Sequence, residues 1–238
     1  MKLILILFIF LSLPAFAQSP GELIPKAKLI FEDDFNRTES DDSKEELGNN
    51  WKTNSAKRAQ GIKQADLNDG VLHIKMAKEA DHGVSVLHTN PFDDGIVTVK
   101  FKMLTSKGMK FNYNDPKAKK VTWAGHICAV GVTPNSVQIV DQIEGYFRLD
   151  IHNMRKAGKK KEAAALCKDK AITKKAKLEI GKWYEMTMVF KDSTLTAYID
   201  GKEIAKLDSK GLDHLKDNIA FAVNGEVEVD NLKVYSLD

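Results

Sequence analysis

Residues 96–103 read Ile-Val-Thr-Val-Lys-Phe-Lys-Met, and the apolar Val97, Val99, Phe101 and Met103 alternate with polar or charged neighbours. An apolar residue at every second position is typical of a β-strand that buries one face. The same alternation returns at residues 183–190 and 194–199. The Asp200-Gly201 pair that follows favours a tight hairpin turn into residues 202–205, because glycine tolerates positive φ. Many short strands separated by Gly, Asp and Asn predict a sandwich or barrel.

Other segments complete this outline. Strands are expected at residues 28–31 and at 70–76, which follows an Asn-Asp-Gly turn signal. Residues 106–120 are rich in Lys, Asn and Gly and predict a long loop. Residues 154–177 include an alanine run flanked by charges, which favours a short helix inserted between strands. Its lysines are typical of a solvated face, and the lack of interleaved aromatic residues argues against nucleic acid as a partner.

The N-terminus has the features of a secretory signal peptide. Lys2 precedes an apolar run over residues 3–13, then Pro14 and the small-residue pattern that ends at Ala17. A membrane anchor is the alternative, but a spanning helix needs about 20 apolar residues. We therefore expect a signal peptide at 1–17, a lead-in at 18–27 and one domain at 28–238. The mature protein is expected in the periplasm or outside the cell, with no membrane span.

Amino-acid composition and the absence of common motifs exclude only a few classes of function. A formal net charge of +3 is too small to predict a polyanion partner. Cys128 and Cys167 fit either a disulfide or two free thiols, because sequence does not show whether their Cα atoms come close enough. The phosphate-loop, nucleophile-elbow and dinucleotide motifs do not occur.

Several motifs occur in the order found in concanavalin A-like jelly-roll proteins. LIFEDDFN at 29–36 and VDNLKVY at 229–235 resemble the opening and closing strands of family sixteen glycoside hydrolases. NDGVL at 68–72, HGVS at 82–85, PFDD at 91–94 and GHIC at 125–128 are similar to secreted bacterial proteins related to the 3-keto-disaccharide hydrolase domain. The resemblance implies an all-β sandwich of two antiparallel sheets, one of them curved into a groove that binds carbohydrate.

The chain departs from family sixteen at the catalytic signature. Retaining enzymes of that family carry Glu-x-Asp-x-x-Glu, which places two carboxylates on one face about 5 to 5.5 Å apart. That motif does not occur, and Asp141 and Glu144 in the nearest stretch fall on opposite faces of a regular strand. The resemblance to 3-keto-disaccharide hydrolases implies another route, in which a base removes a proton beside the keto group and the leaving group is eliminated.

A polar row is the main candidate site. If residues 146–152 form a strand, Tyr146, Arg148, Asp150 and His152 share one face. Tyr offers an apolar ring with a hydroxyl, Arg and Asp bind vicinal hydroxyls, and His can move a proton. The alternative is a solvent-facing strand with an Arg–Asp pair.

Other residues are expected to complete that groove. His126 follows Gly125 in a strand expected to neighbour the row, and Lys100, Lys102 and His82 supply further polar groups, together with His88.

The enzyme hypothesis gives these residues roles. His152 or His126 is the base and Asp150 orients or replaces it. Arg148 and Lys102 stabilise enolate-like charge. A non-catalytic, lectin-like carbohydrate-binding module and a structural adhesion domain remain as alternatives.

Calcium is the metal that the resemblance implies, in a structural role. In jelly-roll relatives a calcium ion ties the opening strand to the closing one through an aspartate at the position of Asp230. Val227 and Val229 occupy odd positions, whereas Leu232 and Val234 occupy even ones. All four can face the core only if the strand contains an extra residue, so a bulge is predicted near Asp230. A bulge that only bends the strand is the alternative. Histidine and cysteine spacing argues against a transition metal.

Overall fold

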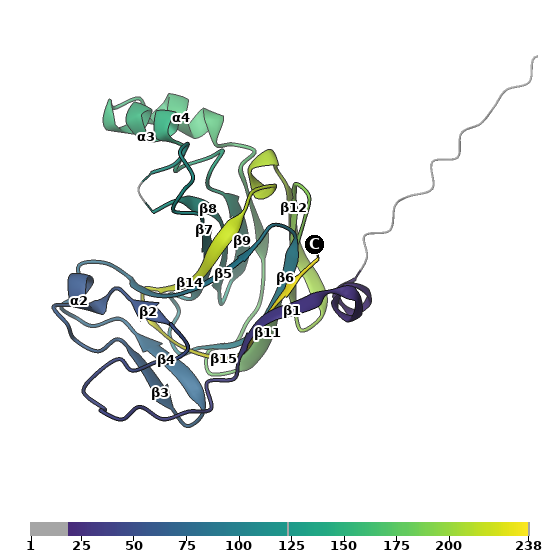
Figure 1. Ribbon diagram of the computed structural model, residues 1–238. Helices are drawn as coiled ribbons and strands as arrows, with labels where there is room; N and C mark the ends of the chain where they lie inside the picture. The colour runs from purple at the N-terminus through teal and green to yellow at the C-terminus, as the bar shows by residue number, and fades with distance from the viewer. Residues whose placement is uncertain (1–18, 123, 238) are drawn as a thin grey trace, which may run out of the picture.

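The computed structural model describes residues 19–122 and 124–237 and shows two antiparallel sheets stacked face to face (Figure 1). The expected signal peptide at 1–17 lies outside the described residues. Sheet 1 has the order β13-β12-β11-β6-β15-β4-β3, with β1 also paired to β15. Sheet 2 has the order β10-β9-β8-β7-β14-β5-β2. Non-consecutive neighbours in both sheets confirm the predicted jelly-roll sandwich.

The strand bounds follow the sequence pattern closely in sheet 1. Its strands are β1 (Lys28–Asp33), β3 (Ala65–Asn68), β4 (Val71–Lys75), β6 (Gly95–Met103), β11 (Trp183–Lys191), β12 (Thr194–Ile199), β13 (Lys202–Asp208) and β15 (Glu226–Ser236). Sheet 2 contains β2 (Lys52–Thr53), β5 (Val84–Phe92), β7 (Met109–Asn114), β8 (His126–Thr133), β9 (Ser136–Asp141), β10 (Ala171–Lys175) and β14 (Lys216–Val223). The strands expected from residues 28, 70, 96, 183 and 194 onward are therefore confirmed.

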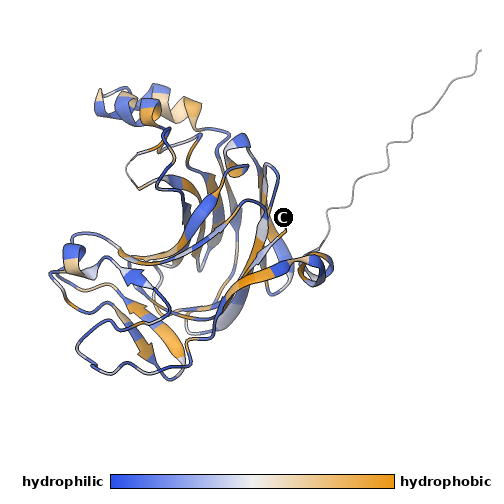
Figure 2. Ribbon diagram, in the orientation of Figure 1, coloured by the Kyte–Doolittle hydropathy of each residue, from blue (hydrophilic) through white to orange (hydrophobic). Residues whose placement is uncertain are grey.

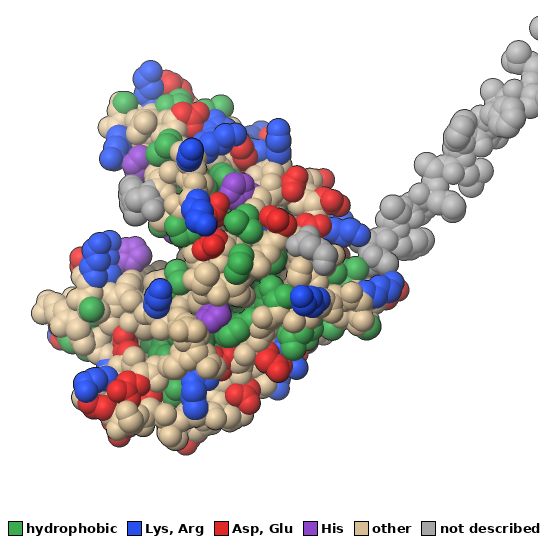
Figure 3. Space-filling view, in the orientation of Figure 1, with side chains coloured by type: hydrophobic (Ala, Val, Ile, Leu, Met, Phe, Trp, Pro, Cys, Tyr) green, Lys and Arg blue, Asp and Glu red, His purple; other side chains and the backbone are tan. Residues whose placement is uncertain are grey.

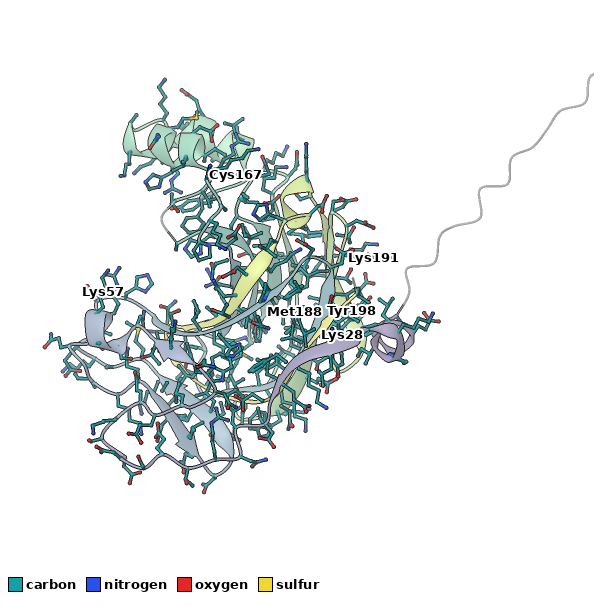
Figure 4. All side chains as sticks on the ribbon, in the orientation of Figure 1. Lys28, Lys57, Cys167, Met188, Lys191 and Tyr198 are labelled. Atoms are coloured by element: carbon teal, nitrogen blue, oxygen red, sulfur yellow. The ribbon has the colours of Figure 1, made fainter. Side chains whose placement is uncertain are left out.

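The core lies between the two sheets. In β6 the alternating Val97, Val99, Phe101 and Met103 are all fully buried, whereas Lys100 is exposed. Figure 2 shows apolar stretches within the strands of both sheets, and Figure 4 shows Met188 of β11 in the interior. The predicted hairpin turn is also present, because Asp200 and Gly201 have φ of 48° and 75°. Burial of the inward faces is the dominant stabilising contribution of this fold.

Short helices decorate the sandwich. They are α1 (Pro20–Leu23), the 3-10 turn η1 (Ile24–Lys26), α2 (Ser55–Arg58), α3 (Leu149–Lys156), α4 (Lys160–Leu166) and η2 (Lys210–Leu212). The lead-in is folded: Leu23 packs in a small cluster with Ile96, Val189 and Tyr198 on the outer face of sheet 1. Among the described residues, no helix combines the length and apolar character needed to cross a membrane.

The prediction of a long loop over residues 106–120 is wrong for the central part of that segment. Residues 109–114 form β7, a central strand of sheet 2, and Met109, Phe111 and Tyr113 are buried. Lys110 and Asn112 lie between them, on the opposite face of the strand. The composition is loop-like because those polar residues occupy the outward face, while the apolar residues keep a strict period of two.

The strand expected over residues 146–152 is also wrong. The chain turns over residues 143–147, and α3 begins at Leu149. Asp150 lies in the first helical turn, where a carboxylate is favourable, and its Oδ1 accepts the Ile151 backbone N–H at 2.8 Å. The helical insertion therefore exists but begins five residues earlier than residue 154, and residues 171–175 form strand β10.

The two cysteines are free thiols in this structure. Cys128 lies in β8 within the core, and burial raises the pKa of its thiol to about 12. Cys167 follows α4 and is partly exposed. Of the two possibilities left open by the sequence, the structure has the unpaired one.

Candidate functional site

The outward face of sheet 2 forms the floor of the candidate site. Figure 3 shows the molecule hollowed on one side, between the part that carries α3 and α4 and the part that carries α2. Cross-strand pairs set the rows of this floor: Asn112 lies between Ala129 and Ala220, and Lys110 lies between Gly131 and Ala222. Small side chains beside longer polar ones leave room for a ligand to lie against the sheet.

His126 is the best-positioned titratable group on this face. Its Nδ1 lies 2.8 Å from Oδ1 of Asn114, and Nδ2 of Asn114 donates to Oδ1 of Asn218 at 2.9 Å. Because the Asn114 amide donates through its nitrogen, its oxygen is the acceptor for an imidazole N–H at Nδ1. That tautomer leaves the Nε2 lone pair of His126 as a proton acceptor.

The electrostatics favour the neutral imidazole. Burial lowers the pKa of His126, and electrostatic repulsion from His82 and Lys110 lowers it further. His82 belongs to the loop that precedes β5 and lies near enough to His126 to influence its pKa. The structure therefore brings two of the expected site histidines near each other. A neutral histidine with one nitrogen held by an amide has the form of a general base.

Backbone geometry fixes His126 at the start of β8. Gly125 has φ of 67°, and a Cβ at this position would lie 1.9 Å from the Asp115 carbonyl oxygen. The Asp115 N–H donates to the Gly125 carbonyl at 2.7 Å, which closes the loop between β7 and β8. Only glycine permits this approach, so the Gly-His pair of the sequence positions the imidazole beside Asn114.

Aromatic side chains extend the site from His126 toward α3. The Phe147 ring lies 4.3 Å from the His126 ring, and the Tyr146 ring lies 5.2 Å from that of Phe147 in an edge-on arrangement. The Phe147 carbonyl accepts the Thr122 N–H at 3.1 Å, which holds the turn against the loop. Tyr146 is 50% exposed, and the Arg155 guanidinium covers one face of its ring, so the remaining surface of the ring is available to a ligand.

A second hollow lies further along the same face. A cavity of about 150 Å³ is lined mainly by polar residues and glycines, including Lys107, Lys110, Thr133, Ser136, Gln138, Thr173 and Asn224. Lys110 is four residues from Asn114 along β7, and a strand rises about 3.4 Å per residue, so the cavity lies about 14 Å from the end of the groove that holds His126. That spacing fits a ligand of more than one sugar ring.

The expected polar row does not form. Arg148 Nε contacts Asp150 Oδ1 at 2.7 Å and Arg148 Nη1 contacts Glu144 Oε2 at 3.2 Å, so its charge is neutralised. Asp150 and His152 lie on α3 and not on a sheet strand. Tyr146 lies beside the floor because its ring contacts Phe147. Arg148, Asp150 and His152 belong instead to the helical hairpin, which consists of α3 and α4 and spans residues 148–166.

Lys100 and Lys102 lie on the other sheet. Both belong to the outward face of β6 in sheet 1, where Lys102 pairs with Glu228 and Lys100 is opposite Asp230. The sandwich core separates them from His126, so they cannot complete the groove. His88 does not belong to the groove either: it faces the core and its ring stacks on Phe31 with centroids 3.8 Å apart.

Sequence reasoning missed three contributors to the site. Asn114, Asn218 and Lys110 lie on strands β7 and β14, the first of which was expected to be a loop. The alternation of apolar and polar residues over 109–114 is the signal that identifies the strand and its outward residues.

The closing strand contains the predicted bulge. The register between β15 and β6 shifts between Asp230 and Lys233, and Asn231 has φ of 51°. Asp230 Oδ1 accepts the Asn231 N–H at 2.7 Å. Burial raises the pKa of Asp230, and the charge of Asp34 adds to this effect.

A cavity of about 370 Å³ lies beside this bulge, between the opening and closing strands. It is lined by Glu32, Asp33, Asp34, Asn49 and residues 231–233, which supply oxygen donors of the kind calcium prefers. The Asp33 carboxylate already accepts hydrogen bonds from other side chains. Within residues 19–122 and 124–237, no three His, Cys, Asp or Glu side chains form a metal-binding group. Calcium at Asp230 stays a prediction.

Comparisons with known proteins agree with this architecture. Residues 35–235 match the family described as the 3-keto-alpha-glucoside-1,2-lyase-like domain. An endo-β-1,3(4)-glucanase of family GH16 has a similar structure, with a TM-score of 0.57, 13% identity, and coverage of 92% of this chain and 93% of the glucanase. A laminarinase from Flavobacterium sp. gives a TM-score of 0.56 and 13% identity, with coverage of 87% and 100%.

A carbohydrate-binding module has a similar fold. The carbohydrate-binding module CBM66 from Bacillus subtilis gives a TM-score of 0.52 and 12% identity, with coverage of 78% of this chain and 95% of the module. No curated protein sequence matches this one. At these identities the likeness to solved structures establishes the fold alone.

Proposed function

The chain belongs to the 3-keto-alpha-glucoside-1,2-lyase-like domain family, and from that premise we propose that it cleaves 3-keto-glucosides by proton abstraction and elimination. The observation that carries the proposal is the imidazole of His126, which is held at Nδ1 by Asn114 and keeps Nε2 as a proton acceptor.

The reaction balances with one base and one proton. A keto group at C3 acidifies the C2–H bond, and Nε2 of His126 takes that proton. The electron pair of the C2–H bond forms the C1=C2 double bond while the C1–O bond breaks. The leaving oxygen departs with the C1–O electron pair and takes a proton, so the products are a 3-keto sugar with a C1=C2 double bond and the free alcohol.

Charge on the groove floor supports the enolate-like state. Lys110 is a cation of this face whose charge acts on His126 over a distance. It contributes a long-range positive potential in place of the direct stabilisation that the sequence assigned to Lys102 and Arg148. Arg148 is already neutralised by Asp150 and Glu144. Elimination needs a single base, so this route does not require the paired carboxylates of a retaining glycosidase.

The experiment follows cleavage of methyl 3-keto-α-glucoside through the ultraviolet absorbance of the conjugated product. His126→Ala should lower turnover by about 10²- to 10⁴-fold, the range for loss of a general base. His73→Ala is the matched control, because His73 pairs with Glu226 on the outer face of sheet 1. An unchanged rate in His126→Ala contradicts the assigned base, and a wild-type protein that cleaves no 3-keto-glucoside contradicts the reaction.

A lectin-like module is the second candidate. The polar cavity beside Lys110 favours it, because its lining residues offer hydrogen bonds to sugar hydroxyls and include no carboxylate. In that case the protein binds oligosaccharides in a calorimetric titration, His126→Ala binds them equally well, and no product forms.

Two further expectations belong to the same proposal. The protein is exported to the periplasm or the cell exterior by the segment at 1–17, and it holds a structural calcium at Asp230 that takes no part in the chemistry.

A further inference from the structure

A cavity lies between the helical hairpin and the turn that precedes it. It has a volume of about 500 Å³ and is lined by Tyr146, Arg155, Lys160, Ala163, Ala164 and Cys167. Figure 4 shows Cys167 at the end of this hairpin, across the hollow from Lys57 of α2. The volume falls in the range of small-molecule sites.

The cavity combines apolar walls with positive charge. Tyr146 and the two alanines supply carbon surface, and burial raises the pKa of the Cys167 thiol, so this residue is neutral. Arg155 and Lys160 are the charged residues of the lining, and no acidic side chain accompanies them. The site therefore suits a ring that carries an anionic group.

Arg155 is held in place without losing its charge. Its guanidinium lies 3.3 Å from the centroid of the Tyr146 ring, and Nη1 donates to the Tyr146 carbonyl at 3.1 Å. In the described part of the chain, no carboxylate lies within ion-pair distance of Arg155 or Lys160, whereas Arg148 on the same hairpin is paired with Asp150 and Glu144. A fixed guanidinium with unused N–H groups is a preorganised site for a carboxylate.

The cavity adjoins the proposed base. Tyr146 contacts Phe147, and Phe147 contacts His126, so one aromatic side chain separates the cavity wall from the imidazole. A leaving group on the C1 oxygen of a sugar held at His126 would reach the cavity by spanning the Phe147 ring. Resting on the proposed function above, we propose that this cavity binds the leaving group of the substrate and selects a ring that carries a carboxylate.

The test measures binding and does not depend on turnover. The probes are 4-hydroxybenzoate and its neutral near-isostere 4-hydroxybenzamide, titrated calorimetrically into the full chain, with glucuronate and glucose as a second pair. We expect the acid of one pair to bind about tenfold more tightly than its neutral partner, and the pair that shows the preference identifies an aromatic acid or a sugar acid as the ligand. Equal affinity within both pairs, or no binding at all, overturns the proposal.

Variants locate the effect. Arg155→Met and Lys160→Met should each remove most of the preference, whereas Lys156→Met, an exposed cation on the same helix, should keep it. Arg155→Met also removes the stacking of Arg155 on the Tyr146 ring. Lys160→Met leaves that stacking intact, so it tests the effect of charge separately. A preference retained in both cavity variants overturns the proposal. If His126→Ala keeps the preference while no 3-keto-glucoside is cleaved by the wild type, the cavity stands and the proposed reaction fails.

Discussion

Nδ1 of His126 lies 2.8 Å from Oδ1 of Asn114, and this contact joins two strands at the point where their register shifts. The shift between Tyr113 and Asn114 turns His126 to the outward face of sheet 2, although Cys128, two residues later, points into the core. The bulge and the amide together select the tautomer of the proposed base.

Asn114→Asp should raise the pKa of His126. A carboxylate beside Nδ1 favours the imidazolium form, and opposite charges at this distance shift a pKa by about one unit or more. The acidic limb of the rate profile and the histidine NMR titration should both move to higher pH.

Asn112→Asp is the control for this prediction. Asn112 lies on the same outward face of β7 but is paired opposite Ala129 and Ala220, two residues from Asn114. It adds the same charge further away and should shift the titration less. An equal shift in both variants contradicts a direct role of the Asn114 contact.

Local patterns predicted the parts of the fold where one face is buried and the other is solvated. Strand β6 is such a case, because the exposed Lys100 lies between the buried Val99 and Phe101. Strand β12, expected and observed at 194–199, keeps the same alternation although residues 195–199 are buried on both faces. Strand β7 was missed because its outward Lys110 and Asn112 resemble loop residues when the alternation of the neighbouring apolar positions is not weighed. Polar residues on a groove floor weaken the composition signal of a strand.

The candidate site was predicted only in part, for a physical reason. His126, His82 and Tyr146 were identified as polar or aromatic residues of a groove, but their partners depend on strand order and register. Polar and apolar residues alternate over residues 146–152, as in a strand. A segment of seven residues is too short for this alternation to exclude the start of a helix. Asn218 is distant in sequence from Asn114, and no local pattern joins them.

His88→Phe should make the fold more stable in acid. Burial lowers the pKa of His88, so the unfolded chain binds the proton more readily, and wild-type stability falls as the pH drops through about 6.5. Phenylalanine keeps a ring beside Phe31 and removes the titration. Thermal unfolding at pH 7.5 and pH 5 should show a smaller loss in the variant than in the wild type.

His126→Gln provides the comparison, because the pKa of His126 is lowered in the same direction. Each variant should remove part of the acid sensitivity, and the double variant should remove more. A wild-type stability that stays constant from pH 7.5 to 5 contradicts both assignments.

Calcium should raise the melting temperature if it ties the opening strand to the closing one at Asp230. Addition of millimolar calcium after chelation should stabilise the wild type, because a ligand that binds only the folded state adds its binding free energy to stability. Asp230→Asn keeps the side-chain shape, removes the charge and should abolish the calcium effect. An identical melting temperature with calcium and with chelator contradicts the prediction.

Asp33→Ala should destabilise the protein by about 3 kcal/mol, the lower end of the cost of removing one partner of a buried ion pair. The carboxylate accepts hydrogen bonds from Arg37 at 2.6 Å, Trp51 at 2.8 Å and Asn49 at 3.1 Å, and thereby joins β1 to the segment that precedes β2.

Burial raises the pKa of Asp33, but these hydrogen bonds outweigh it and lower the pKa overall. Its contribution is therefore present above about pH 3.9 and is lost as the pH falls through the lower folded-state pKa. Urea unfolding at pH 7 should show the full difference from the wild type and unfolding near pH 2 a smaller one. Asp34→Ala, at the exposed neighbour, should leave stability close to that of the wild type, and equal effects of the two variants contradict the assigned role of Asp33.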